Sequence, residues 1–119
     1  MCKLIHYRNG QYIADIKQKH IENIAEQAKN CKNINRIMLF GSSVQERCSN
    51  ESDIDIAVFG KMPKSRYLTT SEFRKFQDNL FLYDLNQDYD ILYFCEGQEY
   101  HDPIMADIAQ GTEIYRRDA

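Results

Sequence analysis

Two short apolar segments, separated by a glycine-serine turn, constrain the fold of this 119-residue chain more than any other feature. Residues 34–40 (INRIMLF) end at Gly41, and residues 53–59 (DIDIAVF) alternate acidic with apolar side chains before Gly60. Short runs of this kind, bounded by turn residues, are typical of β-strands. They therefore predict two consecutive strands. No apolar stretch is long enough to cross a bilayer, so we expect no association with a membrane.

Helical periodicity is present on both sides of these strands. Apolar residues recur at helical spacing within residues 15–31 and 68–85, and Thr69 and Glu72 fit a capping box at the start of the second segment. Residues 42–48 (SSVQERC) fit a short helix after the first strand. The remaining elements are a third strand, a short helix and an edge strand, expected at residues 89–94, 103–110 and 112–117. This order predicts a domain of mixed α and β structure, α/β (α+β), in which helices cover a small sheet.

The length suits a single domain over residues 1–119. Asn9 and Gly10 form a turn dipeptide, so residues 1–14 are either a loose lead-in or a short hairpin. The N-terminus lacks the long apolar segment of a signal peptide. The cysteines have neither C-x-x-C spacing nor histidines placed as zinc ligands, which favours reduced thiols in a cytoplasmic protein. They are Cys2, Cys31, Cys48 and Cys95.

The charge of the chain limits its partners. The net charge is −3 and the isoelectric point is about 5.6. A broad basic surface, which non-specific binding to nucleic acid requires, is therefore not expected. We expect no extended nucleic acid as a partner, whereas a single nucleotide is compatible with this charge.

Asp53 and Asp55 place two like charges at the edge of a predicted strand. Because side chains alternate along a strand, both carboxylates lie on one face. At about 6 Å they repel each other by about 3 kcal/mol at an effective dielectric near 20. A cation between them removes this cost, and carboxylate oxygens suit Mg²⁺ or Mn²⁺. The alternative is a solvated strand start with two surface acids.

The turn between the two strands fits the other half of a phosphate site. A glycine at position 41 lets a ligand approach the backbone closely, and free N–H groups at a helix start bind phosphate oxygens. The Ser42 hydroxyl adds a donor. A third acid, Asp90, begins the third predicted strand, and Asp88 competes with it because both share one face. We favour Asp90 because an apolar run follows it directly.

Taken together, Gly41-Ser42, ten further residues and then Asp53-x-Asp55 resemble the signature of the minimal nucleotidyltransferases. This group lies within the DNA polymerase β-like nucleotidyltransferase superfamily. Ser52 completes the family's S-D-x-D form, and Asp90 matches its third acid. The closing residues 108–115 (IAQGTEIY) resemble its last helix, glycine and strand. The resemblance implies the nucleotidyltransferase fold, with a mixed sheet flanked by helices.

The resemblance also implies an activity and a set of residues. A nucleoside monophosphate, usually AMP from ATP, is transferred to an acceptor hydroxyl with release of pyrophosphate. Asp53, Asp55 and Asp90 are expected to be the catalytic and metal-binding acids, with Mg²⁺ or Mn²⁺ as the cofactor. Residues expected to bind the nucleotide are Gly41, Ser42, Ser43 and Ser52.

Small bacterial members of this group often pair with a helical HEPN-type protein as the antitoxin of a toxin–antitoxin module, and they adenylylate a tyrosine of the toxin. Two alternatives stay open. One is a weakly catalytic antitoxin that neutralises its partner by occlusion. The other is an enzyme that modifies a small hydroxylated compound such as an antibiotic, although such members generally carry a further helical domain.

One departure from the family pattern concerns the loop after Ser42. Many members continue with Arg-x-x-Gly, whereas this chain has Ser43 to Glu46 (SVQE). Arg47 follows, and it either supplies a displaced positive charge or is a solvated helix residue. The change bears on phosphate affinity and turnover more than on the fold.

Overall fold

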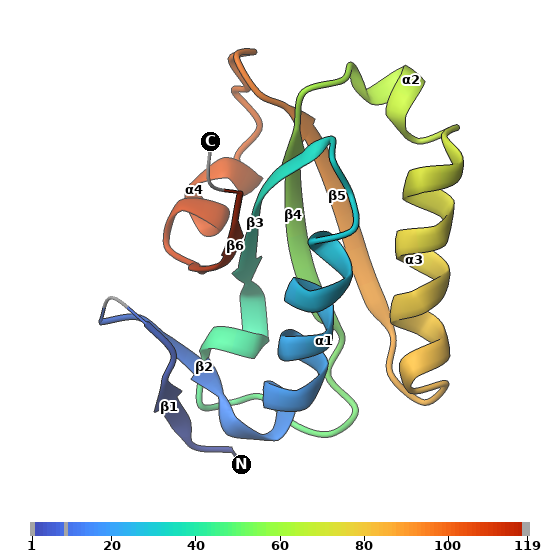
Figure 1. The fold of residues 1–119 in the computed structure, drawn as a ribbon. Coiled ribbons are helices and arrows are strands. Elements are labelled where there is room, and N and C mark those ends of the chain that lie inside the picture. The colour runs from blue at the N-terminus through green and yellow to red at the C-terminus, as the bar shows by residue number, and fades with distance from the viewer. Residues whose placement is uncertain (1, 9, 118–119) are drawn as a thin grey trace.

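The computed structural model describes residues 2–8 and 10–117 (Figure 1). Its centre is a four-stranded sheet in the order β5-β4-β3-β6. The strands are β3 (Ile34–Phe40), β4 (Ile54–Gly60), β5 (Tyr89–Cys95) and β6 (Thr112–Arg116). β3 pairs antiparallel with β4 and β6, and β4 pairs parallel with β5. The expected mixed sheet is thus confirmed, with the closing strand at one edge.

Helices cover both faces of this sheet (Figure 1). α1 (Gln18–Ala28) and α3 (Ser71–Tyr83) pack on one face, and the short α4 (Ile104–Ala109) packs on the other. A 3-10 turn, η1 (Asp15–Lys17), precedes α1, and a second, η2 (Gly41–Val44), follows β3. None of the helices in the described ranges is both long enough and apolar enough to cross a membrane.

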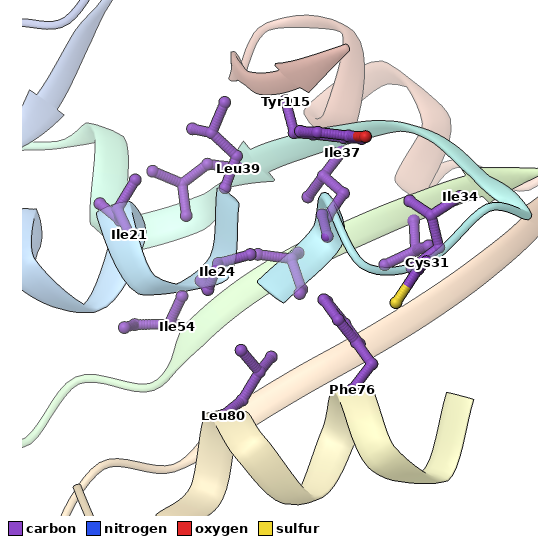
Figure 2. Close-up of a cluster of buried hydrophobic side chains, with 14 of the residues drawn as sticks. Ile21, Ile24, Cys31, Ile34, Ile37, Leu39, Ile54, Phe76, Leu80 and Tyr115 are labelled. Carbon is purple, nitrogen blue, oxygen red and sulfur yellow. The ribbon is translucent and has the colours of Figure 1, made fainter. Parts of the chain in front are cut away.

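The alternation of side chains along β4 separates the core into two layers. Ile54, Ile56 and Val58 join the larger cluster against α1 and α3, part of which Figure 2 shows. Ala57 and Phe59 join the smaller cluster against α4. By the same period of two, Asp55 lies on the α4 face of the sheet. The strand therefore buries side chains on both faces, and the Asp55 carboxylate lies at the start of the row that faces α4.

The N-terminal segment forms a hairpin, which decides between the two expectations for residues 1–14. β1 (Leu4–His6) pairs antiparallel with β2 (Tyr12–Ala14), while the structure of Asn9 lies outside the described residues. Side chains tie the hairpin to the end of the chain. The Thr112 hydroxyl donates to the Tyr12 carbonyl at 2.7 Å, and the Arg8 guanidinium donates to the Ile114 carbonyl at 2.7 Å.

Two local expectations are wrong. The helix after β3 ends as the single turn η2, and residues 45–47 form a bend and turn. The cap of α3 is Thr70 rather than Thr69, because the Thr70 Oγ1 accepts the Phe73 N–H at 3.1 Å. Glu72 instead accepts from the backbone of Lys32 at 3.1 Å and of Asn33 at 3.3 Å. The short α2 (Lys64–Tyr67), which the periodicity did not predict, precedes this cap.

Candidate active site

The parallel pairing of β4 with β5 brings two of the expected acids together. Asp55 and Asp90 are direct partners in the ladder, so their side chains leave the sheet on the same face. Asp53 lies one residue before β4 and, by the period of two, on that face as well. Asp55 is partly buried, whereas Asp53 and Asp90 are exposed. The three acids thus lie at the end of the sheet where β4 and β5 begin.

The pKa of Asp55 records the closeness of these acids. Burial raises the pKa of this carboxyl above its usual range, and the charges of Asp90 and Asp53 raise it further. Arg47 acts in the opposite direction and lowers the same pKa. Like charges destabilise the ionised form of a carboxyl, so the site concentrates negative charge that a cation would neutralise.

Asp88, the competing candidate for the third acid, directly precedes β5. Its carbonyl accepts the Ile54 N–H at 3.0 Å. The ladder pairs Asp55 with Asp90. The contact of Asp88 with β4 is thus made by its backbone.

The turn after β3 is shaped around Asp55. Gly41 has φ +73°, in the left-handed region that side chains disfavour. A Cβ at this position would collide with the Asp55 Oδ2 atom. Glycine is therefore required twice, by the backbone conformation and by the carboxylate beside it. The turn that was expected to hold phosphates lies in contact with the acid that was expected to hold a metal.

The three serines of the expected nucleotide site differ in exposure. Ser42 is 9% exposed and lines a hollow beside Asp53 and Asp55. Ser52 lines the same hollow, and its Oγ accepts the Ser49 N–H at 3.0 Å. Ser43 is fully buried, and its hydroxyl has no hydrogen-bond partner among the described residues. Ser42 and Ser52 thus face the site, and Ser43 has no surface there.

Two hollows lie on either side of Asp55. The first, which we call the α4 hollow, is about 410 Å³ and lies between the Gly41 turn and α4, where Ile104, Asp107 and Gln110 line it. The second, the loop hollow, is about 340 Å³ and is lined by Ser42, Arg47, Glu51, Ser52, Asp53 and Asp55. Both volumes fall in the range of small-molecule sites. A smaller cavity of about 150 Å³ lies between α1 and α3.

Arg47 is the basic residue that both hollows share. It is exposed on the turn after η2, and its Nε donates to the Gln45 side chain. It belongs to no helix, so the expectation of a solvated helix residue is wrong. Its effect on the pKa of Asp55 places a positive charge beside the acids. This position favours the alternative of a displaced cation for phosphate.

The donor set fits a hard divalent cation, although it does not form a closed cage. In residues 2–8 and 10–117, no three Asp, Glu, His or Cys side chains stand close enough to hold a metal ion by themselves. Mg²⁺ commonly keeps several waters and takes further ligands from substrate phosphates, so it needs few protein ligands. The carboxylates of Asp53, Asp55 and Asp90 supply oxygen ligands of the required kind. Their convergence on one face therefore fits the group.

Two buried polar residues near the starts of β4 and β5 were not predicted from the sequence. They are Lys17, at the end of η1, and Gln87, before β5. Lysine and glutamine are mostly exposed, so neither the period nor the residue type indicated their burial.

The fold and the arrangement at this edge define a nucleotidyltransferase class of protein. The chain belongs to the family described as polymerase β, nucleotidyltransferase, whose family model matches residues 22–119. No curated protein sequence matches the chain.

Solved structures share the fold at low sequence identity. The MntA–HpeT toxin–antitoxin complex, in a mutant with two Asp-to-Glu substitutions, gives a TM-score of 0.55 at 18% identity, covering 82% of this chain and 73% of that chain. A tri-AMPylated HEPN toxin of Shewanella oneidensis in complex with an MNT antitoxin gives 0.50 at 19%, covering 85% and 73%. A protein of Sulfolobus solfataricus described as a nucleotidyltransferase gives a TM-score of 0.51 at 20% identity, covering 84% of this chain and 79% of that chain.

Proposed function

We propose that this protein is a metal-dependent nucleotidyltransferase that transfers AMP from ATP to a hydroxyl group of a helical HEPN-type protein in the cytoplasm, as the antitoxin of a toxin–antitoxin pair. The observation that carries the proposal is the ladder pairing of Asp55 with Asp90 beside the Gly41 turn. Carboxylates for a cation and a glycine turn for phosphates lie in contact there. This combination is what transfer of a nucleotidyl group requires.

Each residue of the site has a distinct task in this proposal. Asp53, Asp55 and Asp90 hold the divalent cation, which when bound neutralises the triphosphate and polarises its phosphorus–oxygen bonds. The backbone of Gly41 and Ser42 orients the terminal phosphates, and Arg47 adds a positive charge from the loop hollow. Orientation and fixed charge supply most of the rate enhancement in reactions of this type.

The reaction is an in-line displacement at the α-phosphorus. The acceptor hydroxyl oxygen forms a bond to this phosphorus, and the bond between the α-phosphorus and the bridging oxygen to the β-phosphate breaks. Pyrophosphate leaves with the electron pair of that bond. Asp90, exposed at the start of β5, accepts the proton of the hydroxyl.

Three observations support this proposal. The similar structures include an antitoxin in complex with an AMPylated HEPN toxin. The substitutions named for the MntA–HpeT complex replace two aspartates separated by one residue, which is the spacing of Asp53 and Asp55. In addition, Asp53 and Asp90 are exposed, so the hydroxyl of a large partner can reach the acids.

Occlusion without chemistry is the second candidate. The sequence Ser43 to Glu46 lacks the arginine and glycine with which many family members continue the phosphate loop. Arg47 lies near the acids, but on an exposed turn outside the 3-10 turn η2. An antitoxin that only covers its partner would tolerate these changes. The two candidates differ in whether the acids are needed.

Labelled ATP distinguishes these functions. The purified protein is incubated with Mg²⁺, a HEPN-type protein encoded beside its gene, and ATP labelled at either the α- or the γ-phosphate. Transfer predicts that the partner acquires the α-label and not the γ-label. It also predicts that Asp53→Asn with Asp55→Asn abolishes labelling and neutralisation of the partner.

The matched control replaces two exposed acids outside the site, Glu22→Gln with Asp78→Asn, and so changes the net charge equally. This control should label the partner as the wild type does. Neutralisation that survives the change at Asp53 and Asp55, without any labelling, would establish occlusion and overturn the enzymatic proposal.

A further inference from the structure

A buried lysine lies under the segment that carries Asp53. Lys17 is 2% exposed, and its ammonium donates to the Ser52 carbonyl at 2.9 Å, the Asn50 carbonyl at 3.3 Å and the Gln87 Oε1 at 2.6 Å. These three bonds use all of its donors. An ammonium group is costly to bury unless it is hydrogen-bonded. The three bonds to Ser52, Asn50 and Gln87 offset this cost for Lys17.

Gln87 extends this contact to the neighbouring strand. Its side chain is buried, at 4% exposure, and its Nε2 donates to the Ser52 carbonyl at 3.0 Å and to the Asp88 carbonyl at 2.7 Å. Its Oε1 meanwhile accepts from Lys17. The pair, which we call the Lys17–Gln87 clamp, therefore binds the backbone before β4 and the backbone before β5 at once.

The clamped carbonyls belong to residues next to the acids. Ser52 directly precedes Asp53, and Asp88 lies two positions before Asp90. Ser52 otherwise bonds to Ser49, through a backbone bond of 3.1 Å and a side-chain bond of 3.0 Å. These bonds between Ser49 and Ser52 close the turn on itself. The clamp adds bonds from the Ser52 carbonyl to Lys17 and Gln87, next to the bond of the Ile54 N–H to the Asp88 carbonyl.

We propose that the Lys17–Gln87 clamp is the positioning device of the acids, fixing the backbone that carries Asp53 beside Asp55 and Asp90, where a divalent cation would bind together with substrate phosphates. The inference rests on the proposed function, since it takes these acids as the metal ligands. Lys17 and Gln87 do not touch the cation or the substrate. They act through the Ser52 and Asp88 carbonyls, as supporting groups commonly do behind metal ligands.

Binding of Mn²⁺ to the purified protein, followed by the loss of the free-ion electron paramagnetic resonance signal, tests the clamp without a nucleotide or a partner. Lys17→Met keeps the aliphatic stem and removes the donors, and we expect a loss of affinity of about 10- to 100-fold. Lys19→Met is the matched control, because it removes the same charge from an exposed position on α1. We expect its affinity to equal that of the wild type.

Gln87→Glu separates positioning from stability. The carboxylate keeps the acceptor for Lys17 as an ion pair, and a thermal denaturation curve establishes that the variant is folded under the conditions of the binding measurement. It loses both amide donors to the Ser52 and Asp88 carbonyls, so its Mn²⁺ affinity should fall with that of Lys17→Met. This variant also carries the test if Lys17→Met does not fold.

The outcomes separate the two proposals. Unchanged Mn²⁺ affinity in folded Gln87→Glu would overturn the clamp and leave the proposed function intact. Absence of Mn²⁺ binding to the wild type would instead overturn the metal site, and the positioning role with it.

Discussion

At the scale of single residues, the surroundings of Asp55 disfavour the ionised form of its carboxyl. Burial and the charges of Asp90 and Asp53 raise its pKa in the folded protein, so the folded state binds this proton more tightly than the unfolded chain does. Stability from this group is therefore present at low pH and is lost as the pH rises through the raised pKa. An ionised carboxylate at this position therefore opposes folding, and a bound cation would relieve that cost.

Asp55→Asn should accordingly stabilise the metal-free protein at neutral pH. We expect a gain of about 1 kcal/mol in the free energy of unfolding, because one of three neighbouring charges is removed at a partly solvated site. The gain should shrink as the pH is lowered toward about 4. Thermal unfolding in the presence of a chelator measures it across this pH range, and a loss of stability at pH 7 would contradict the account.

Gly41 permits a second test at this scale, with Gly10 as its matched control. Both have positive φ, +73° and +74°, but a Cβ at position 10 meets no atom within 4 Å, whereas one at position 41 collides with Asp55. Each change to alanine should cost about 1–2 kcal/mol for the left-handed conformation.

The two glycine variants should differ in binding. Gly41→Ala should also abolish binding of Mg²⁺ and ATP, because it displaces the carboxylate, whereas Gly10→Ala should bind normally. Equilibrium titration of both proteins checks this, and normal binding by Gly41→Ala would exclude the turn from the site.

The sequence predicted the position of residues whose type and spacing follow a local pattern. Asp53, Asp55 and Asp90 follow the period of two at strand starts, and Gly41 follows an apolar run. Lys17 and Gln87 could not be recognised, because their burial depends on the packing of η1 beneath a distant loop. The side-chain environment of Ser43 was equally hidden, since alternation does not extend through a 3-10 turn.

At the scale of elements, the start of α3 shows how closely spaced candidates are decided. Thr70 caps the helix, while the Thr69 hydroxyl donates to the Arg66 carbonyl at 2.9 Å. The capping-box spacing pointed to Thr69 because Glu72 follows three residues later. Glu72 is engaged with the start of β3 and with the Tyr67 hydroxyl at 2.7 Å, contacts that a local pattern cannot reveal.

Thr70→Ala should therefore cost about 1 kcal/mol in the free energy of unfolding, the usual effect of losing an N-cap. Thr69→Ala, an adjacent change of the same chemistry, should cost clearly less because the Thr69 hydroxyl bonds near the surface. Urea denaturation of the two variants gives the comparison. Equal losses would mean that Thr70 does not act as the cap.

Strands were predicted more closely than helices. β3 has the expected bounds, β4 begins and ends one residue later than expected, and β5 ends one residue later. Their apolar runs are short and bounded by turn residues, so the limits are local. The predicted first helix divided into η1 and α1, and α2 was missed, because short turns depend on tertiary contacts.

At the scale of the whole molecule, the site is a product of chain topology. The connection from β4 through α3 to β5 places the two strands parallel and in register, so that Asp55 meets Asp90 across 35 positions of sequence. The strand order could not be derived from periodicity. The family resemblance indicated the sheet, and the structure supplied the register that pairs Asp55 with Asp90.

The central claim is that these three acids form one divalent-cation site for a nucleotide. Isothermal titration with Mg²⁺ and an ATP analogue that cannot be cleaved between the α- and β-phosphates tests it directly. We predict that the wild type binds only when Mg²⁺ is present, that Asp90→Asn loses this binding, and that Asp88→Asn keeps it. Equal binding by the wild type and Asp90→Asn, or binding that ignores Mg²⁺, would contradict the account.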